Sequence, residues 1–98
     1  MQVIGRDKLV KFSRKHSEAK AVLDAWYDEV GSDTCIWTAP HDITNRFPKA
    51  SILGKKGERV VFRIKGNHIR LIVQVSYRAG RVLIERVGTH AEYDKWNL

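Results

Sequence analysis

The chain has 98 residues, of which 43% are hydrophobic, and its 18 lysines and arginines against 11 acidic residues give a net charge of +7. A chain of this size buries one small core, which leaves no room for a second domain, so residues 1–98 are expected to form a single domain. The charge predicts an anionic partner: nucleic acid, an anionic membrane surface or an acidic protein.

The sequence lacks the features of a membrane protein, a secreted protein and a metal-binding protein. No apolar run has the length of a transmembrane helix and the N-terminus does not resemble a signal peptide, so a cytoplasmic location is expected. Cys35 is the single cysteine, which rules out an intramolecular disulfide. The four histidines have neither cysteine partners nor the spacing of metal ligands. The sequence therefore predicts no metal site and no cofactor.

A short strand and a basic helix are predicted at the start of the chain. Residues 1–4 are expected to add an edge strand to a later sheet. Within residues 6–16, three apolar residues lie in one helical turn and lysines and arginines surround them. This pattern predicts an amphipathic basic helix, whose start Asp7 favours.

A second helix is predicted over residues 19–30, with Ser17 as its N-cap and Gly31 at its end. Its apolar stripe contains Trp26 and Tyr27, which we interpret as core residues. Two helices joined by a tight break form a hairpin, and the combined apolar stripe of this hairpin can cover one face of a sheet.

Residues 32–53 have an irregular pattern, within which only residues 41–47 predict a short helical turn. The basic, glycine-containing loop that follows carries Lys55 and Lys56 and leads to Arg59. Loops of this kind are usually only solvated, but this one enters a strand that holds another arginine.

The densest run of β-branched and aromatic residues begins at Arg59. Residues 66–67 and 78–80 have the composition of tight turns, which predicts a three-stranded antiparallel meander. Counting outward from the first turn places Arg63 opposite Arg70.

Side-chain alternation divides this meander into an apolar face and an open, cationic face. The residues predicted on the apolar face are Phe62, Ile64, Ile69, Leu71, Val73 and Val75. Arg63, Arg70 and Arg86 are expected on the open face. Opposed arginines cost up to about 1 kcal/mol, so one interpretation places an anion between Arg63 and Arg70. In the other, both side chains extend into water or contact Glu58 or Glu85.

A short last helix is predicted near the C-terminus. Thr89, followed three residues later by Glu92, has the pattern of a capping box. Helical spacing places His90, Tyr93 and Asp94 on one face, and side chains of these types can take part in proton transfer. Packing of Tyr93 against the sheet is the alternative interpretation.

Three stretches make nearly the whole chain similar to a known family. They are GNHIRLI at residues 66–72, THAEYDK at residues 89–95 and Phe47-Pro48 before the basic loop. With them the chain resembles the HigB family of bacterial toxins, within the RelE-like superfamily of messenger-RNA interferases. The resemblance implies an α+β, RelE-like fold with two N-terminal helices packed on a twisted, mostly antiparallel sheet, and a short C-terminal helix.

The resemblance also implies a function. The protein would be the toxin of a type II toxin-antitoxin system, an endoribonuclease that cleaves translated messenger RNA on the ribosome. The implied reaction needs no metal: the ribose 2′-hydroxyl attacks the adjacent phosphate and leaves a 2′,3′-cyclic phosphate and a 5′-hydroxyl. The implied partners are messenger RNA on the ribosome and a HigA-type helix-turn-helix antitoxin, with operator DNA bound only through the antitoxin complex and no membrane partner.

Matching residues to the family gives the expected site. Arg70 matches the sheet arginine, Tyr93 matches the C-terminal tyrosine, and His90 is an acid/base candidate. The expected RNA-binding residues are Lys55, Lys56, Arg59, Arg63 and Arg86. A non-catalytic RNA- or ribosome-binding domain is the competing hypothesis, because a basic face with tyrosine and tryptophan is sufficient for it.

Overall fold

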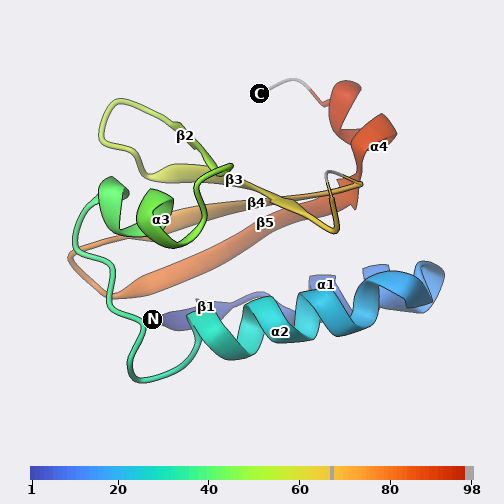
Figure 1. Ribbon diagram of the computed structural model, residues 1–98, viewed down its shortest axis with the longest axis horizontal. Helices are drawn as coiled ribbons and strands as arrows, with labels where there is room; N and C mark the ends of the chain where they lie inside the picture. The colour runs from blue at the N-terminus through green and yellow to red at the C-terminus, as the bar shows by residue number, and fades with distance from the viewer. Residues whose placement is uncertain (67, 97–98) are drawn as a thin grey trace.

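The structure is a computed structural model that describes residues 1–66 and 68–96, and in this part of the chain five strands form one mixed sheet in the order β1-β5-β4-β3-β2 (Figure 1). The strands are β1 (Gln2–Ile4), β2 (Ser51–Leu53), β3 (Arg59–Ile64), β4 (Ile69–Ser76) and β5 (Arg81–Thr89). β1 runs parallel to β5, and every other pair of neighbours is antiparallel. The predicted edge strand and meander are therefore confirmed.

Helices lie on both faces of this sheet. They are α1 (Arg6–Lys15), α2 (Lys20–Val30), α3 (Pro40–Arg46) and α4 (His90–Asp94), with a 3-10 turn, η1 (Ser17–Ala19), between the first two. Figure 1 shows α1 and α2 against one face and α4 above the other face. This arrangement confirms the predicted α+β, RelE-like fold. None of the helices in the described residues is long and apolar enough to cross a membrane.

The core lies between the α1–α2 pair and the sheet. Trp26 of α2 is buried in it, and Tyr27 packs against it from a partly buried position. Five of the six residues predicted on the apolar face of the sheet belong to this core, and Ile64 packs against it. The alternation along β3 and β4 was therefore predicted correctly.

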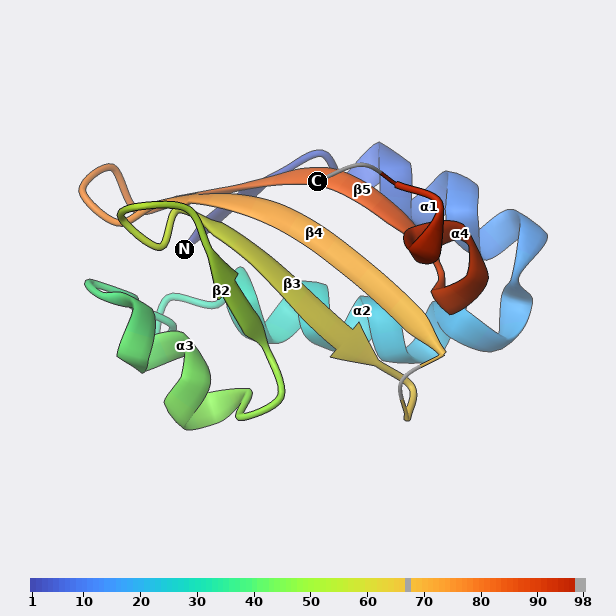
Figure 2. The same cartoon turned by 90° about the horizontal axis from the view of Figure 1, so that it is seen from above.

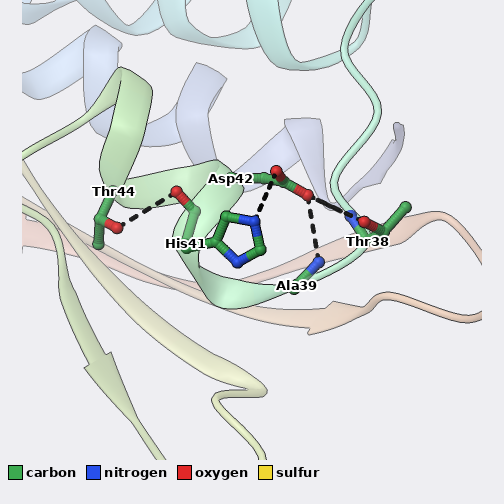
Figure 3. Close-up of polar contacts among 5 residues, drawn as sticks. All are labelled: Thr38, Ala39, His41, Asp42 and Thr44. Atoms are coloured by element: carbon green, nitrogen blue, oxygen red, sulfur yellow. Dashed lines mark hydrogen bonds and ion pairs between the residues drawn. The ribbon is translucent and has the colours of Figure 1, made fainter.

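An aromatic cluster closes the core beside β3. The rings of Trp37 and Phe47 pack against Phe62, with centroids 6.1 and 5.1 Å from it. α3 positions this cluster, and Asp42 in its first turn accepts hydrogen bonds from the backbone N–H groups of Thr38, at 2.8 Å, and Ala39, at 3.2 Å (Figure 3).

These hydrogen bonds hold the pKa of Asp42 below its usual range, with the bond from the Thr38 backbone as the largest cause. The helical turn predicted over residues 41–47 is confirmed, and it begins one residue earlier because proline is well suited to the first helical position.

The register between β3 and β4 agrees with the prediction, whereas the register between β4 and β5 shifts by one residue. Arg63 lies opposite Arg70. Between β4 and β5 the register shifts, so that Ile72 pairs with Arg86 while Val73 pairs with Ile84. Glu85 is therefore the extra residue of a β-bulge, a feature that commonly redirects a side chain.

Three local features differ from expectation. Ser17 begins η1, so α2 starts at Lys20 and its N-cap position is occupied by Ala19 instead of Ser17. The strand β2 lies in the segment predicted to be irregular. In the first turn of the meander the left-handed backbone already begins at Lys65, with φ 54°, and Asn67 lies outside the described residues.

Candidate functional site

Two rows of side chains cross the open face of the sheet. The first row consists of Arg63, Arg70 and Gly88, which pair across β3, β4 and β5. The second row consists of Val61, Ile72 and Arg86. Val61 and Ile72 are buried although they face away from the core cluster. Aliphatic stems of long basic side chains can cover such apolar surface, and arginines stand in both rows.

Arg70 faces the open side of the sheet as predicted, but its side chain is not open to solvent. Only 4% of it is exposed, whereas Arg63 beside it is exposed. The Tyr93 ring of α4 lies over Arg70, with 5.4 Å from the guanidinium carbon to the ring centroid. A cation over an aromatic face is stabilised by about 2 kcal/mol when water is excluded. Arg70 thus lies on the predicted face of the sheet, where α4 covers it.

A capping box fixes the start of α4. Thr89 Oγ1 accepts a hydrogen bond from the Glu92 backbone N–H at 3.2 Å, and Glu92 Oε1 accepts one from the Thr89 N–H at 3.0 Å. The hydrogen bond from the Thr89 backbone is the largest cause that holds the pKa of Glu92 below its usual range, and the nearby Lys15 ammonium adds to it. The predicted capping box is confirmed, and it determines where Tyr93 projects.

Gly88 and Trp96 bring α4 close to β5. A Cβ atom on Gly88 would lie 2.6 Å from Trp96 Cζ2, a distance that real side chains do not adopt. The Trp96 ring also meets Tyr93, with centroids 5.9 Å apart, and the Arg86 guanidinium, 5.4 Å from its centroid. Neither Gly88 nor Trp96 was among the site residues predicted from the sequence. A glycine inside a strand was the available signal, since it often marks a close approach.

His90 and Asp94, which were predicted to share one face of the last helix, are in contact. His90 Nδ1 lies 3.2 Å from Asp94 Oδ2, and the imidazole is about half exposed, at 49%. His90 lines a hollow at the end of the sheet together with His16 and His68. Tyr93 is thus the candidate residue of α4 that contacts Arg70, and His90 projects toward a neighbouring surface.

The basic loop lies far from this contact. Figure 2 shows the β2–β3 loop and α4 at opposite ends of the sheet. Lys55 and Lys56 are exposed, and the backbone N–H of Lys56 donates to Glu58 Oε2 at 2.9 Å. The Tyr77 hydroxyl donates to the Gly57 carbonyl at 2.6 Å. The structure therefore holds the loop in place but does not bring its lysines to Arg70.

Arg59 is engaged in an ion pair. Its Nε and Nη2 atoms each lie 3.3 Å from a carboxylate oxygen of Glu85. The bulge presents Glu85 on the open face, where it reaches across β4 to β3. Glu85 was a predicted partner of Arg63 or Arg70, whereas its carboxylate binds Arg59. In bidentate pairing of this kind, the carboxylate balances the charge of the guanidinium and fixes its orientation.

Metal-binding side chains do not gather in the described residues: no group of three or more His, Cys, Asp or Glu is placed to hold a metal ion there. Burial raises the pKa of the Cys35 thiol, which makes it a weak nucleophile at neutral pH. The chemistry available at the site is therefore that of arginine, tyrosine, histidine and carboxylate side chains.

Comparison of the sequence with known protein families finds one that covers most of the chain. The model of the HigB toxin family, described as the RelE-like toxic component of a toxin-antitoxin system, matches residues 19–96. The chain belongs to the HigB toxin family. No curated protein matches it. Membership of the HigB family identifies the protein as a toxin of the RelE-like type and implies an antitoxin partner.

Proposed function

We propose that this HigB toxin is an endoribonuclease that cleaves translated messenger RNA on the ribosome, with the RNA 2′-hydroxyl as nucleophile. The observation that carries the proposal is the contact between Arg70 and Tyr93 on a cationic sheet face. A guanidinium is charged at every working pH and binds a phosphate through two parallel hydrogen bonds. Charge that develops on the phosphate in the transition state would meet a preorganised cation.

Tyr93 would have to yield for a phosphate to reach Arg70, because the arginine is only 4% exposed. An RNA base stacking on the tyrosine could replace the contact that the ring loses with the guanidinium. Binding and uncovering of the arginine would then be one event. The ribosome would supply the fixed strand geometry that a flexible RNA lacks, which explains why cleavage would require it.

His90 is our candidate for proton transfer. The Asp94 carboxylate, 3.2 Å from Nδ1, would orient the imidazole and leave Nε2 available to a substrate that extends from Arg70 to the neighbouring hollow. Exposed Arg63, one strand from Arg70, would bind a phosphate of the strand. Lys55, Lys56 and Arg86 would contact RNA outside the reacting group, and Arg59 would do so only after separating from Glu85.

The antitoxin would be a HigA-type helix-turn-helix protein that covers the cationic face or keeps Tyr93 over Arg70. A purified complex should therefore bind ribosomes weakly and leave messenger RNA uncut. Full cleavage by the intact complex would contradict this part of the proposal.

The central experiment compares cleavage of a defined messenger RNA on programmed ribosomes with cleavage of the same RNA alone. Each reaction is repeated with a metal chelator, and magnesium is added back to the concentration that the ribosome needs. We expect many turnovers, 2′,3′-cyclic phosphate ends, and cleavage only on ribosomes. Robust cleavage of free RNA, or a strict metal requirement, would overturn the mechanism. Tight RNA binding without cleavage would support the non-catalytic alternative.

A further inference from the structure

A second cationic surface lies at the edge of β5, beside α4. A cavity of about 570 Å³ opens there between α1, β5 and α4. We call it the α1 groove, and the residues that matter for its chemistry are Lys8, Lys11, Arg14, Lys15, Arg86 and Trp96. Figures 1 and 2 place α4 and the C-terminal part of α1 at the same end of the sheet.

The groove exists because β1 covers only part of the β5 edge. β1 pairs with residues 81–83, and the following edge is left to α1. Lys8 Nζ donates to the carbonyl oxygens of Ile84, at 3.2 Å, and Glu85, at 3.1 Å. Lys8 thus attaches α1 to β5 at the β-bulge.

The charge of the α1 groove is unbalanced. Lys11, Arg14 and Lys15 are exposed, and no ion pair within residues 1–66 and 68–96 involves them. Glu92 is the carboxylate that lines the groove, and its oxygen already accepts the capping hydrogen bond of α4. A cationic groove of this kind has the electrostatics of a site for several phosphates.

The groove also connects to the candidate active site. Arg86 belongs to the second row on the open face, opposite Ile72, and its guanidinium lies over the Trp96 ring. Trp96 in turn contacts Tyr93, which covers Arg70. A path of aromatic rings and cations therefore runs from Arg70 around the edge of β5 to α1. Proteins that bind single-stranded RNA combine aromatic surfaces, on which bases stack, with cations that contact the phosphates.

We propose that the α1 groove binds the phosphates of the messenger strand next to the cleaved phosphate, with Trp96 as a stacking surface for one base. The inference rests on the proposed function and adds to it the path of the substrate. Lys11 and Lys15 are one helical turn apart, about 6 Å between Cβ atoms, so their flexible side chains can reach successive phosphates.

The test measures binding without cleavage. A fluorescent RNA of about nine nucleotides, with 2′-O-methyl groups that prevent attack, is titrated with the toxin and followed by anisotropy. We expect the double variant Lys11→Gln/Lys15→Gln to bind the RNA about tenfold more weakly than the wild type. The slope of log K against log salt concentration should become less steep by roughly 1.4, which is twice the value for one phosphate contact on a single strand. Lys8 is left unchanged because it holds α1 to β5.

A matched control removes the same charge elsewhere. Lys49 and Arg78 are exposed and lie outside the groove, so Lys49→Gln/Arg78→Gln lowers the net charge equally. We expect this control to lose less than about threefold in affinity, because general attraction is spread over the whole protein. Circular dichroism would establish that both double variants are folded. Equal affinities of the two double variants would overturn the groove assignment.

Binding to ribosomes shows whether the phosphates in the groove belong to messenger RNA or to ribosomal RNA. Binding to ribosomes without messenger RNA should be the same for the groove variant and the control, since the groove is assigned to the messenger strand. A loss confined to these empty ribosomes would assign the groove to ribosomal RNA and refute our proposal. Groove-dependent binding of the uncleavable RNA, together with no cleavage on any ribosome, would refute the endoribonuclease function and leave the groove in place.

Discussion

The guanidinium carbon of Arg70 lies 5.4 Å from the centroid of the Tyr93 ring, so β4 and α4 meet over a single positive charge. Arg63, the cross-strand neighbour of Arg70, is exposed to water. The two opposed arginines therefore occupy different environments: one is solvated and the other lies under an aromatic face. This arrangement reduces the cost of their repulsion, since water screens one of the two charges.

Replacing Arg70 should separate catalysis from binding. Arg70→Ala should lower single-turnover cleavage on ribosomes by a hundredfold or more, about 3 kcal/mol, with a much smaller loss of ribosome affinity. Arg70→Lys should recover only part of the rate, because lysine lacks the planar fork. Since the side chain is buried, we expect the alanine variant to melt at a lower temperature while remaining folded.

Arg63→Ala is the matched control for that experiment, because it removes the same charge from the same row at an exposed position. We expect it to cost less than about tenfold in rate, as its contact is made equally in substrate and transition state. Near-normal cleavage by a folded Arg70→Ala would exclude this arginine from the reaction.

Tyr93 variants should show whether the ring or the hydroxyl is needed. The observed contact with Arg70 uses the ring face, so Tyr93→Phe should retain cleavage within about tenfold, while Tyr93→Ala should lose much more. A hydroxyl that transferred a proton would contribute roughly a hundredfold or more. Equal losses in the two variants, measured as single-turnover rates, would therefore transfer the proton-transfer role from His90 to Tyr93.

The ion pair between Arg59 and Glu85 should limit RNA binding. Glu85→Gln releases the arginine, so affinity for the uncleavable RNA should rise while the free energy of unfolding falls by about 1 kcal/mol. Asp33→Asn is the control, since it removes one exposed negative charge outside the sheet. If both substitutions raised the affinity by the same factor, the gain would come from net charge and not from Arg59.

The capping box should make α4 sensitive to acid. The folded pKa of Glu92 is lowered from its ordinary value of 4.5, so its stabilisation of α4 is complete above that value and is lost as pH falls through the lower folded pKa. The indole N–H signal of Trp96 in an acid titration by nuclear magnetic resonance would report it. Glu92→Gln keeps an acceptor without the charge, so its titration should lack this transition.

Thr89→Ala tests the same cap at neutral pH. Loss of an N-cap costs about 1 kcal/mol. Because α4 carries Tyr93 and Trp96, we expect the cleavage rate to fall by a larger factor than global stability alone would produce. A rate that stayed at the wild-type value would show that α4 docks without its cap.

Sequence alone determined the features that depend on near neighbours in the chain. The pairing of Arg63 with Arg70 followed from a tight turn and an alternation of two, and the capping box followed from Thr89 and Glu92, three residues apart. Both rest on hydrogen bonds between residues close in sequence, whose geometry is nearly independent of the rest of the fold. Family membership likewise followed from short contiguous stretches.

Tertiary structure alone decided the environments of the charged side chains. Arg70 is buried because Gly88 lets Trp96 approach β5, which places Tyr93 above β4. The charge of Arg59 is balanced by Glu85, because a bulge places this carboxylate on the open face. Burial and ion pairing depend on contacts between residues distant in sequence, and periodicity, which assigns a side chain to a face, carries no information about what covers that face.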